Sequence, residues 1–248
     1  MLLAGSPTAW AGDGDAPVEI AYSIVATYPH DPGAFTQGLA YAGGVLYEST
    51  GLYGRSSVRR VDLKSGRPEL IRPLAGHYFG EGLTVFGERL IQLTWRSGKA
   101  FVYRRGDLQP VGEYRYTTEG WGLTQDGEHL IMSDGSATLY FLDGDRFSEV
   151  RRLEVRDHLG PVTLLNELEY VGGDIYANVW RSPKILRIDA GSGRVTGFID
   201  LSALVARMDR EPSTDVLNGI AYIPGSGRLL ITGKQWPYVY AIELARSD

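Results

Sequence analysis

Five related stretches recur along the chain and carry most of the residues that could do chemistry. They are FTQGLAY from Phe35, FGEGL from Phe79, EGWGLTQ from Glu119, LNELEYV from Leu165 and LNGIAYI from Leu217. The second copy contains an acid, Glu81, between Gly80 and Gly82. Glycine on both sides lets the backbone approach closely, and burial beside aromatic rings would raise the pKa of the carboxyl group. Glu81 is therefore a candidate general acid or base. The alternative is a structural Glu81 that accepts hydrogen bonds from backbone amides.

The spacing of these stretches indicates which elements position them. Aligned on a branched residue, the copies fall at Leu39, Leu83, Leu123, Leu168 and Ile220, in steps of 44, 40, 45 and 52 residues. A period of this size is typical of one supersecondary unit that is repeated. Each of the first four units divides into four short strands with Gly-containing turns, and the fifth into three. The sequence therefore predicts an all-β fold of five four-stranded units.

A missing strand suggests how the array closes. The last unit is one strand short, whereas the segment from Glu19 to Tyr28 is a strand without a unit. If this segment pairs beside Tyr238 to Leu244, it completes the last unit and covers an exposed edge. The expected fold is a five-bladed β-propeller closed by an N-terminal strand. A β-sandwich with coincidental spacing is the alternative.

Two segments lie outside the strand pattern. Residues 1–16 resemble the end of a secretory signal, with Ala9-Trp10-Ala11 as a small-x-small cleavage site, or else form a disordered terminus. Residues 17–248 then form a single propeller domain, and the protein is expected to be periplasmic or secreted. The long connection from Ser202 to Leu217 has helix-like spacing at its start and is either a lid or a surface insertion.

Composition narrows the classes of partner and cofactor. A formal charge of -5 offers no basic surface for nucleic acid. No apolar run approaches the roughly 20 residues of a membrane helix, so no membrane partner is expected. The chain has no cysteine, and no two of His30, His77, His129 and His158 have a short metal-ligand spacing. We therefore expect a protein that uses no metal and no cofactor, and we also expect it to be a monomer.

Hairpin geometry gathers the unusual residues at one end of the predicted channel. Residues just before a hairpin's first strand and just after its second strand lie at the same end. In these five units they include carboxylates, amides, a lysine and three tryptophans, namely Phe35, Gln37, Glu48, Phe79, Glu81, Trp95, Glu119, Trp121, Asp134, Asn166, Glu167, Asn178, Trp180, Asn218 and Lys234. An aromatic mouth with a few converging polar groups is the usual form of a ligand site.

Ten segments in order carry a family resemblance. FTQGL, YESTGLYG, FGEGL, LTW, EGWGL, SDGS, LNELE, ANVW, LNGIA and GKQWP resemble the plant and bacterial type of glutaminyl-peptide cyclotransferase, from about Tyr28 to Ile242. The resemblance implies a metal-independent five-bladed propeller that converts the N-terminal glutamine of peptides or proteins to pyroglutamate and releases ammonia. The family's site residues match Phe35, Gln37, Phe79, Glu81, Trp95, Trp121, Asn166, Trp180 and Lys234.

The chemistry of that reaction suggests a role for each type of residue. Glu81 could move both protons, and Lys234 or Asn166 could stabilise the oxyanion. Trp95, Trp121 and Trp180, together with Phe35 and Phe79, could bind the glutamine side chain and exclude water. Gln37 and Glu119 could hold the peptide's ammonium or amide group. Each role has a structural alternative: Lys234 could form a plain salt bridge, and the tryptophans could pack between blades.

Two other functions remain open from the residues alone. One is a non-catalytic propeller that binds peptides, and the other is a calcium-dependent, lactonase-like hydrolase. The second would need carboxylates and asparagines converging on one cation, which Glu48, Asn166, Asn178 and Asn218 could supply poorly. The tryptophans and Lys234 at the same mouth argue against a cation there.

Overall fold

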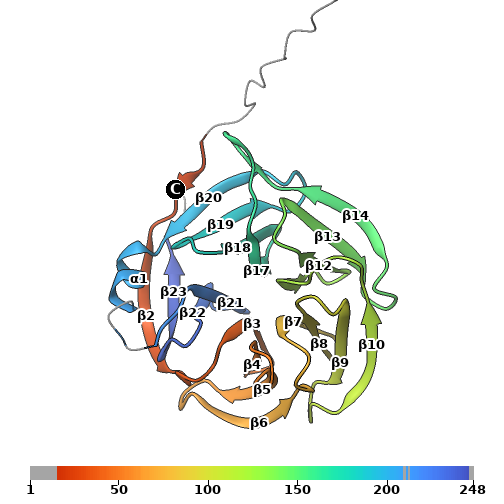
Figure 1. Cartoon of the computed structure of the whole chain (residues 1–248). Helices are drawn as coiled ribbons and strands as arrows, with labels where there is room; N and C mark the ends of the chain where they lie inside the picture. Colours follow the sequence, from red (N-terminus) through yellow and green to blue (C-terminus); the bar gives the residue numbers. More distant parts are fainter. Residues whose placement is uncertain (1–15, 209–210, 212, 246–248) are drawn as a thin grey trace, which may run out of the picture.

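Five sheets, each built on an antiparallel meander, repeat around one axis; four have four strands, and one has an additional short parallel strand at its outer edge. The computed structural model describes residues 16–208, 211 and 213–245. The first strands of the five sheets contact one another around the ring and lie nearest the axis (Figure 1). The first and second strands of each sheet are largely buried, because a neighbouring blade covers each face. The predicted five-bladed propeller is confirmed.

The first three blades follow the chain without interruption. Blade 1 consists of β3 (Thr36–Ala42), β4 (Val45–Thr50), β5 (Ser57–Asp62) and β6 (Arg67–Pro73). Blade 2 consists of β7 (Gly80–Phe86), β8 (Arg89–Thr94), β9 (Lys99–Arg104) and β10 (Pro110–Arg115). Blade 3 consists of β11 (Leu123–Gln125), β12 (His129–Ser133), β13 (Thr138–Asp143) and β14 (Glu149–Glu154). Each blade is a meander, as the turn residues predicted.

The N-terminal strand is divided between the last two blades. Blade 4 consists of β17 (Leu165–Val171), β18 (Asp174–Val179), β19 (Lys184–Asp189), β20 (Val195–Asp200) and the short β1 (Val18–Glu19), which pairs parallel to β20. Blade 5 consists of β21 (Leu217–Ile223), β22 (Arg228–Gly233), β23 (Tyr238–Leu244) and β2 (Tyr22–Pro29). The register of β2 places Tyr22 opposite Leu244 and Pro29 opposite Tyr238. The predicted closure is confirmed, and the segment also ties blade 4 to blade 5.

The core consists of separate apolar clusters between neighbouring blades. Leu83 and Tyr47 belong to the cluster between blades 1 and 2, and Leu39 and Leu230 to the cluster between blades 5 and 1. Three further clusters fill the remaining interfaces. Since every interface is apolar, the closing interface between blades 5 and 1 is built like the other four.

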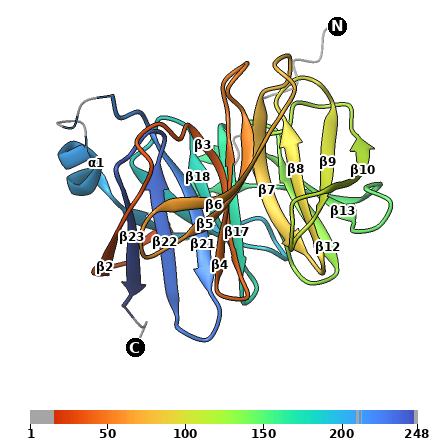
Figure 2. The same cartoon turned by 90° about the horizontal axis from the view of Figure 1, so that it is seen from below.

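A helix and a small hairpin lie outside the five blades. Helix α1 (Ser202–Met208) confirms the predicted helical spacing, and Asp200 Oδ1 accepts a hydrogen bond from Ser202 N at its start. Leu204 and Met208 are buried in the cluster between blades 4 and 5, so α1 covers the outer edge rather than the mouth (Figures 1 and 2). A small hairpin, β15 (Arg156–Asp157) and β16 (Gly160–Pro161), links blades 3 and 4.

No described helix is long and apolar enough to cross a membrane. The signal-like stretch predicted at the start lies outside the described residues, except for Ala16.

Candidate active site

Equivalent residues of the five inner strands, the first strand of each blade, line the bottom of the mouth, which we call its floor. They lie two residues before the aligned Leu or Ile, and in blades 1 to 5 they are Gln37, Glu81, Trp121, Asn166 and Asn218. In four blades the pairing of the first two strands shifts at this place, which marks a β-bulge. A bulge turns a side chain away from the regular alternation. The repeat therefore presents one side chain from each blade at one level of the channel, and four types of side chain occur there.

The next residue along each inner strand closes the channel beneath this floor. Four blades have glycine there, and a Cβ on Gly82 would lie 2.6 Å from the carbonyl oxygen of Trp121. The inner strands can approach closely only because these positions lack side chains. Blade 4 has Glu167 instead, whose oxygens accept hydrogen bonds from Leu39 N at 3.1 Å and Ile220 N at 2.8 Å. Its fully buried carboxyl group joins blades 1, 4 and 5 across the axis.

Glu81 is buried at the floor of the mouth, where its side chain is bonded to a neighbouring blade. Gln37 Nε2 donates a hydrogen bond of 2.9 Å to Glu81 Oε1, and Glu81 is 5% exposed. Burial raises the pKa of this carboxyl group well above its ordinary value, and the negative charge of Glu119 acts in the same direction. The nearby charge of Lys234 only partly opposes the rise in pKa. Glu81 can therefore hold a proton at a pH at which an ordinary glutamate is ionised.

Lys234 is the basic partner of Glu81. Its side chain is nearly buried, and Nζ lies 4.8 Å from the centre of the Phe35 ring. Burial lowers the pKa of Lys234, although the charges of Glu81 and Asp215 favour its protonated form. The backbone is fixed by hydrogen bonds from Lys234 N to Val216 O and from Asp215 N to Lys234 O, each 2.9 Å long. The segment that follows α1 thus positions this lysine.

Glu119 anchors two of the predicted aromatic walls. Its Oε2 accepts hydrogen bonds from Trp95 Nε1 at 2.7 Å and Trp121 Nε1 at 2.9 Å, and its Oε1 accepts one from Arg96 Nε at 2.8 Å. Burial alone would raise the pKa of Glu119, but these three donors lower it. Glu81 and Glu119 therefore have pKa values displaced in opposite directions, which is the usual mark of an acid and a permanent anion in one site.

Aromatic rings in contact with one another line the mouth. Phe79 packs edge-on against Phe35 at 6.3 Å, Trp95 at 5.6 Å and Tyr53 at 5.4 Å between ring centres. Sequence reasoning missed Tyr53, although it follows the second strand of blade 1 in the segment YESTGLYG. Trp121, which shares Glu119 Oε2 with Trp95, packs edge-on against Trp180 at 5.9 Å between ring centres. The predicted tryptophans thus belong to the mouth.

Tyr116 is a second residue that sequence reasoning missed. Its hydroxyl group donates to Thr94 O and accepts a hydrogen bond of 2.9 Å from Thr94 N. Burial raises the pKa of Tyr116 to about 12, and the charge of Glu81 contributes to this rise. Tyr116 comes after the last strand of blade 2, and no motif marks it in the sequence. The fold alone brings it near Glu81.

Several amide groups at this level have atoms with unused hydrogen-bonding capacity. Asn218 Nδ2 donates to Thr36 O, and Asn178 Oδ1 accepts from Gly219 N. Among the described residues, the buried atoms Gln37 Oε1, Asn166 Oδ1, Asn178 Nδ2 and Asn218 Oδ1 have no hydrogen-bond partner. Three of these four atoms are acceptors, which suits a ligand or water that donates hydrogen bonds.

The residues considered for calcium do not act together. Glu48 of blade 1 accepts a hydrogen bond of 2.7 Å at Oε1 from Thr36 Oγ1, and the same oxygen contacts Nε2 of His30, which follows β2, at 2.9 Å. In residues 16–208, 211 and 213–245, no three His, Cys, Asp or Glu side chains are grouped so that they could hold a metal ion.

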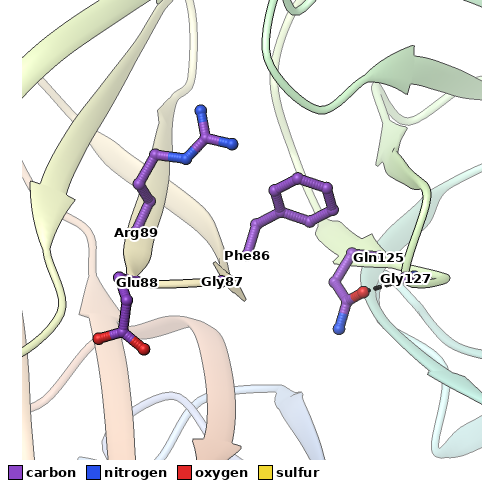
Figure 3. A pocket seen from close by; sticks show the side chains of 6 residues that line it. All are labelled: Phe86, Gly87, Glu88, Arg89, Gln125 and Gly127. Atoms are coloured by element: carbon purple, nitrogen blue, oxygen red, sulfur yellow. Dashed lines mark hydrogen bonds between the residues drawn. The ribbon is translucent and has the colours of Figure 1, made fainter.

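A separate surface hollow lies at the opposite end of the propeller. Its volume is about 470 Å³, and the turns after β7 and β11 line it with Phe86, Gly87, Glu88, Arg89, Gln125 and Gly127 (Figure 3). Gly127 N donates to Gln125 Oε1, so this amide serves the turn. The hollow contains none of the predicted site residues.

The fold and the mouth define a β-propeller with an acid and a lysine buried inside an aromatic entrance. The family model described as glutamine cyclotransferase matches residues 1–244, and the chain belongs to this family. The glutaminyl-peptide cyclotransferase of Arabidopsis thaliana is 45% identical over 229 residues, which cover 91% of this chain and 72% of the plant protein.

One solved structure supports this assignment, and another shares the fold. The crystal structure of Myxococcus xanthus glutaminyl cyclase superposes with a TM-score of 0.87 and 42% identity, covering 94% of this chain and 100% of that one. The WD40 β-propeller domain of Doa1 is 11% identical with a TM-score of 0.52, over 85% of this chain and 63% of that one. The second likeness concerns the propeller fold alone.

Proposed function

We propose that this protein is a glutaminyl-peptide cyclotransferase, which converts the N-terminal glutamine of a peptide or protein to pyroglutamate. The observation that carries the proposal is Glu81, a buried carboxyl group with a raised pKa that lies beside Gln37 and Lys234 inside an aromatic mouth. Family membership and the relatives named above support the same activity.

Glu81 is proposed to carry the one proton that must move. The neutral α-amine attacks the side-chain amide carbon, and a new carbon-nitrogen bond forms. The Glu81 carboxylate accepts the proton that the attacking amine loses, and then donates it to the amide nitrogen as ammonia leaves. A carboxyl group can do both steps when its pKa lies near the working pH, as burial of Glu81 favours.

Two nearby groups are proposed to stabilise the tetrahedral oxyanion. Lys234, which follows β22 of blade 5, offers an ammonium group, and Asn166 of β17 in blade 4 offers an amide; both side chains are buried. A positioned donor of this kind typically contributes about 3 kcal/mol to transition-state stabilisation. The low-dielectric surroundings that lower the pKa of Lys234 would also strengthen its interaction with a developing negative charge.

The aromatic residues are proposed to hold the glutamine and to keep water out. Phe35, Phe79 and Trp95 form one group of rings, and Trp121 and Trp180 form a second group that Glu119 joins to the first. Excluding water favours attack by the amine over hydrolysis of the amide. Gln37 Oε1 remains available to accept a hydrogen bond from the substrate's ammonium or amide group.

Mass spectrometry tests the activity directly. A peptide that begins with glutamine should lose the mass of ammonia when incubated with the protein, and the matched peptide that begins with asparagine should react far more slowly. Both peptides unchanged after prolonged incubation would refute the proposal.

Export and a monomeric state are further proposals. The signal-like residues 1–16 support a periplasmic or secreted location, which N-terminal sequencing of the protein from cell fractions would check. The ring's closure by its own β2 supports a monomer, which light scattering after gel filtration would check.

A further inference from the structure

Two arginines occupy the same place in blades 2 and 4. Each directly follows the tryptophan at the end of its blade's second strand, as Trp95-Arg96 and Trp180-Arg181. Each guanidinium group lies over the ring of that tryptophan, with Arg96 Cζ at 3.8 Å and Arg181 Cζ at 4.3 Å from the ring centre. Stacking of this kind holds a cation in place at the rim of the mouth.

The two arginines differ in how their charge is used. Arg96 donates to Glu119 Oε1 at 2.8 Å, so its charge is compensated within the site. Arg181 is exposed, and none of the described carboxylates lies within ion-pair distance of it. An exposed, uncompensated cation that is fixed on a flat ring is available to a carboxylate from outside.

The backbone at Arg181 has a left-handed conformation that recurs at the equivalent position of blade 5. Arg181 has a φ of 65°, and Gln235 has a φ of 60° at the same position of blade 5. Trp180 is anchored by a hydrogen bond of 2.9 Å from its backbone N to Leu164 O, and its ring packs edge-on against Trp121. The guanidinium group is therefore attached to the wall that would enclose the substrate's glutamine.

Substrate geometry directs the rest of the peptide over this rim. If the N-terminal glutamine occupies the mouth, the following residues must emerge past the aromatic wall, because Glu167 closes the channel below. We infer that Arg181, stacked on Trp180, forms a subsite for a carboxylate in the second to fourth residue of the peptide. The inference rests on the proposed function and adds a preference for acidic peptides.

Competition among defined peptides tests the subsite. The probes are amidated tetrapeptides that begin with glutamine and carry one glutamate at position 2, 3 or 4, each compared with its alanine counterpart. In the wild type we expect kcat/KM to favour glutamate at one of these positions by about two- to five-fold at low salt. The preference should shrink as ionic strength rises.

Three variants assign the effect to one side chain. Arg181→Gln introduces the residue that blade 5 already has at this backbone position, so folding should be preserved, and it should abolish the preference. Arg181→Glu should reverse it. Arg55→Gln is the matched control, because Arg55 is another exposed arginine in a mouth-side loop, after β4, but no ring fixes it; this variant should keep the preference.

The outcomes separate the subsite from the activity itself. Turnover of every glutamine peptide without any preference for glutamate, or a preference that survives in Arg181→Gln, would overturn the subsite and leave the proposed function intact. No turnover of any glutamine peptide by the wild type would overturn both.

Discussion

Glu81 in blade 2 and Glu167 in blade 4 are buried carboxyl groups whose places in the repeat differ by one residue. Burial raises the pKa of both well above the ordinary value. Glu81 is bonded to a side chain, Gln37, at the floor of the mouth, whereas Glu167 is held by two backbone amides at the closed centre. A carboxyl group that exchanges protons with a substrate must be reachable by that substrate. A carboxyl group that holds strands together needs hydrogen-bond partners that do not move. One step of register therefore separates a candidate catalyst from a structural acid.

The largest effect should come from removing the proton carrier. Glu81→Gln keeps the size and the bond to Gln37 but cannot take up a proton, so kcat should fall by about 10² to 10⁴. KM should change little, because the aromatic walls and amides remain. Steady-state kinetics on a glutamine peptide and a thermal melt would measure both properties. Near wild-type kcat in this variant would show that another group moves the proton.

The matched change at the centre should affect stability instead of catalysis. In Glu167→Gln, the amide NH₂ group would face Leu39 N or Ile220 N and leave one buried donor without an acceptor. We expect a loss of about 1–3 kcal/mol in the free energy of unfolding. At about 2–4 °C per kcal/mol, the Tm should fall by several degrees. A kcat loss comparable to that of Glu81→Gln, without a fall in Tm, would contradict the distinction.

Glu119→Gln tests whether the ionised acid of the mouth is a positioning residue. The amide can accept from one tryptophan but loses the ion pair with Arg96, so the wall formed by Trp95 and Trp121 should loosen. We expect kcat/KM to fall about ten-fold, as for a hydrogen bond to a charged group. Tryptophan fluorescence should change in parallel. Unchanged fluorescence together with a fall as large as that of Glu81→Gln would assign the proton transfer to Glu119.

The smallest effect concerns the pH dependence of stability. The folded pKa of Glu167 lies above its unfolded value, near 4.5, so its neutral form favours the fold. That contribution is fully present below pH 4.5 and is lost as the pH rises through the folded pKa. The Tm difference between the wild type and Glu167→Gln should therefore narrow from pH 5 to pH 9.

An exposed acid provides the control for that measurement. Glu113 pairs with Lys99 on the outer strand of blade 2, and its pKa is lowered. Glu113→Gln should give a Tm curve parallel to the wild-type curve across this pH range, because the group stays ionised in both states. If Glu167→Gln also gave a parallel curve, burial of Glu167 would have no effect on the linkage.

The repeat in the sequence determined the architecture and much of the site. Five copies of one motif, with a strand missing at the end and one spare at the start, predict five blades and their closure by β2. Hairpin ends then place Glu81, Lys234 and the tryptophans at one mouth, because residues at equivalent positions of a repeat reach equivalent positions in space. These inferences need only periodicity and strand geometry.

Only the tertiary structure decided what each side chain contacts. The sequence predicted Glu119 as a group that holds substrate, whereas the fold directs both of its oxygens to Trp95, Trp121 and Arg96. It also brings Tyr116, which no motif marks, near Glu81. The bulges in the inner strands and the width of the channel set these contacts, and both depend on how neighbouring blades pack. The local sequence around a residue does not show this packing. The pKa and the hydrogen bonds of a side chain depend on groups that come from distant segments of the chain.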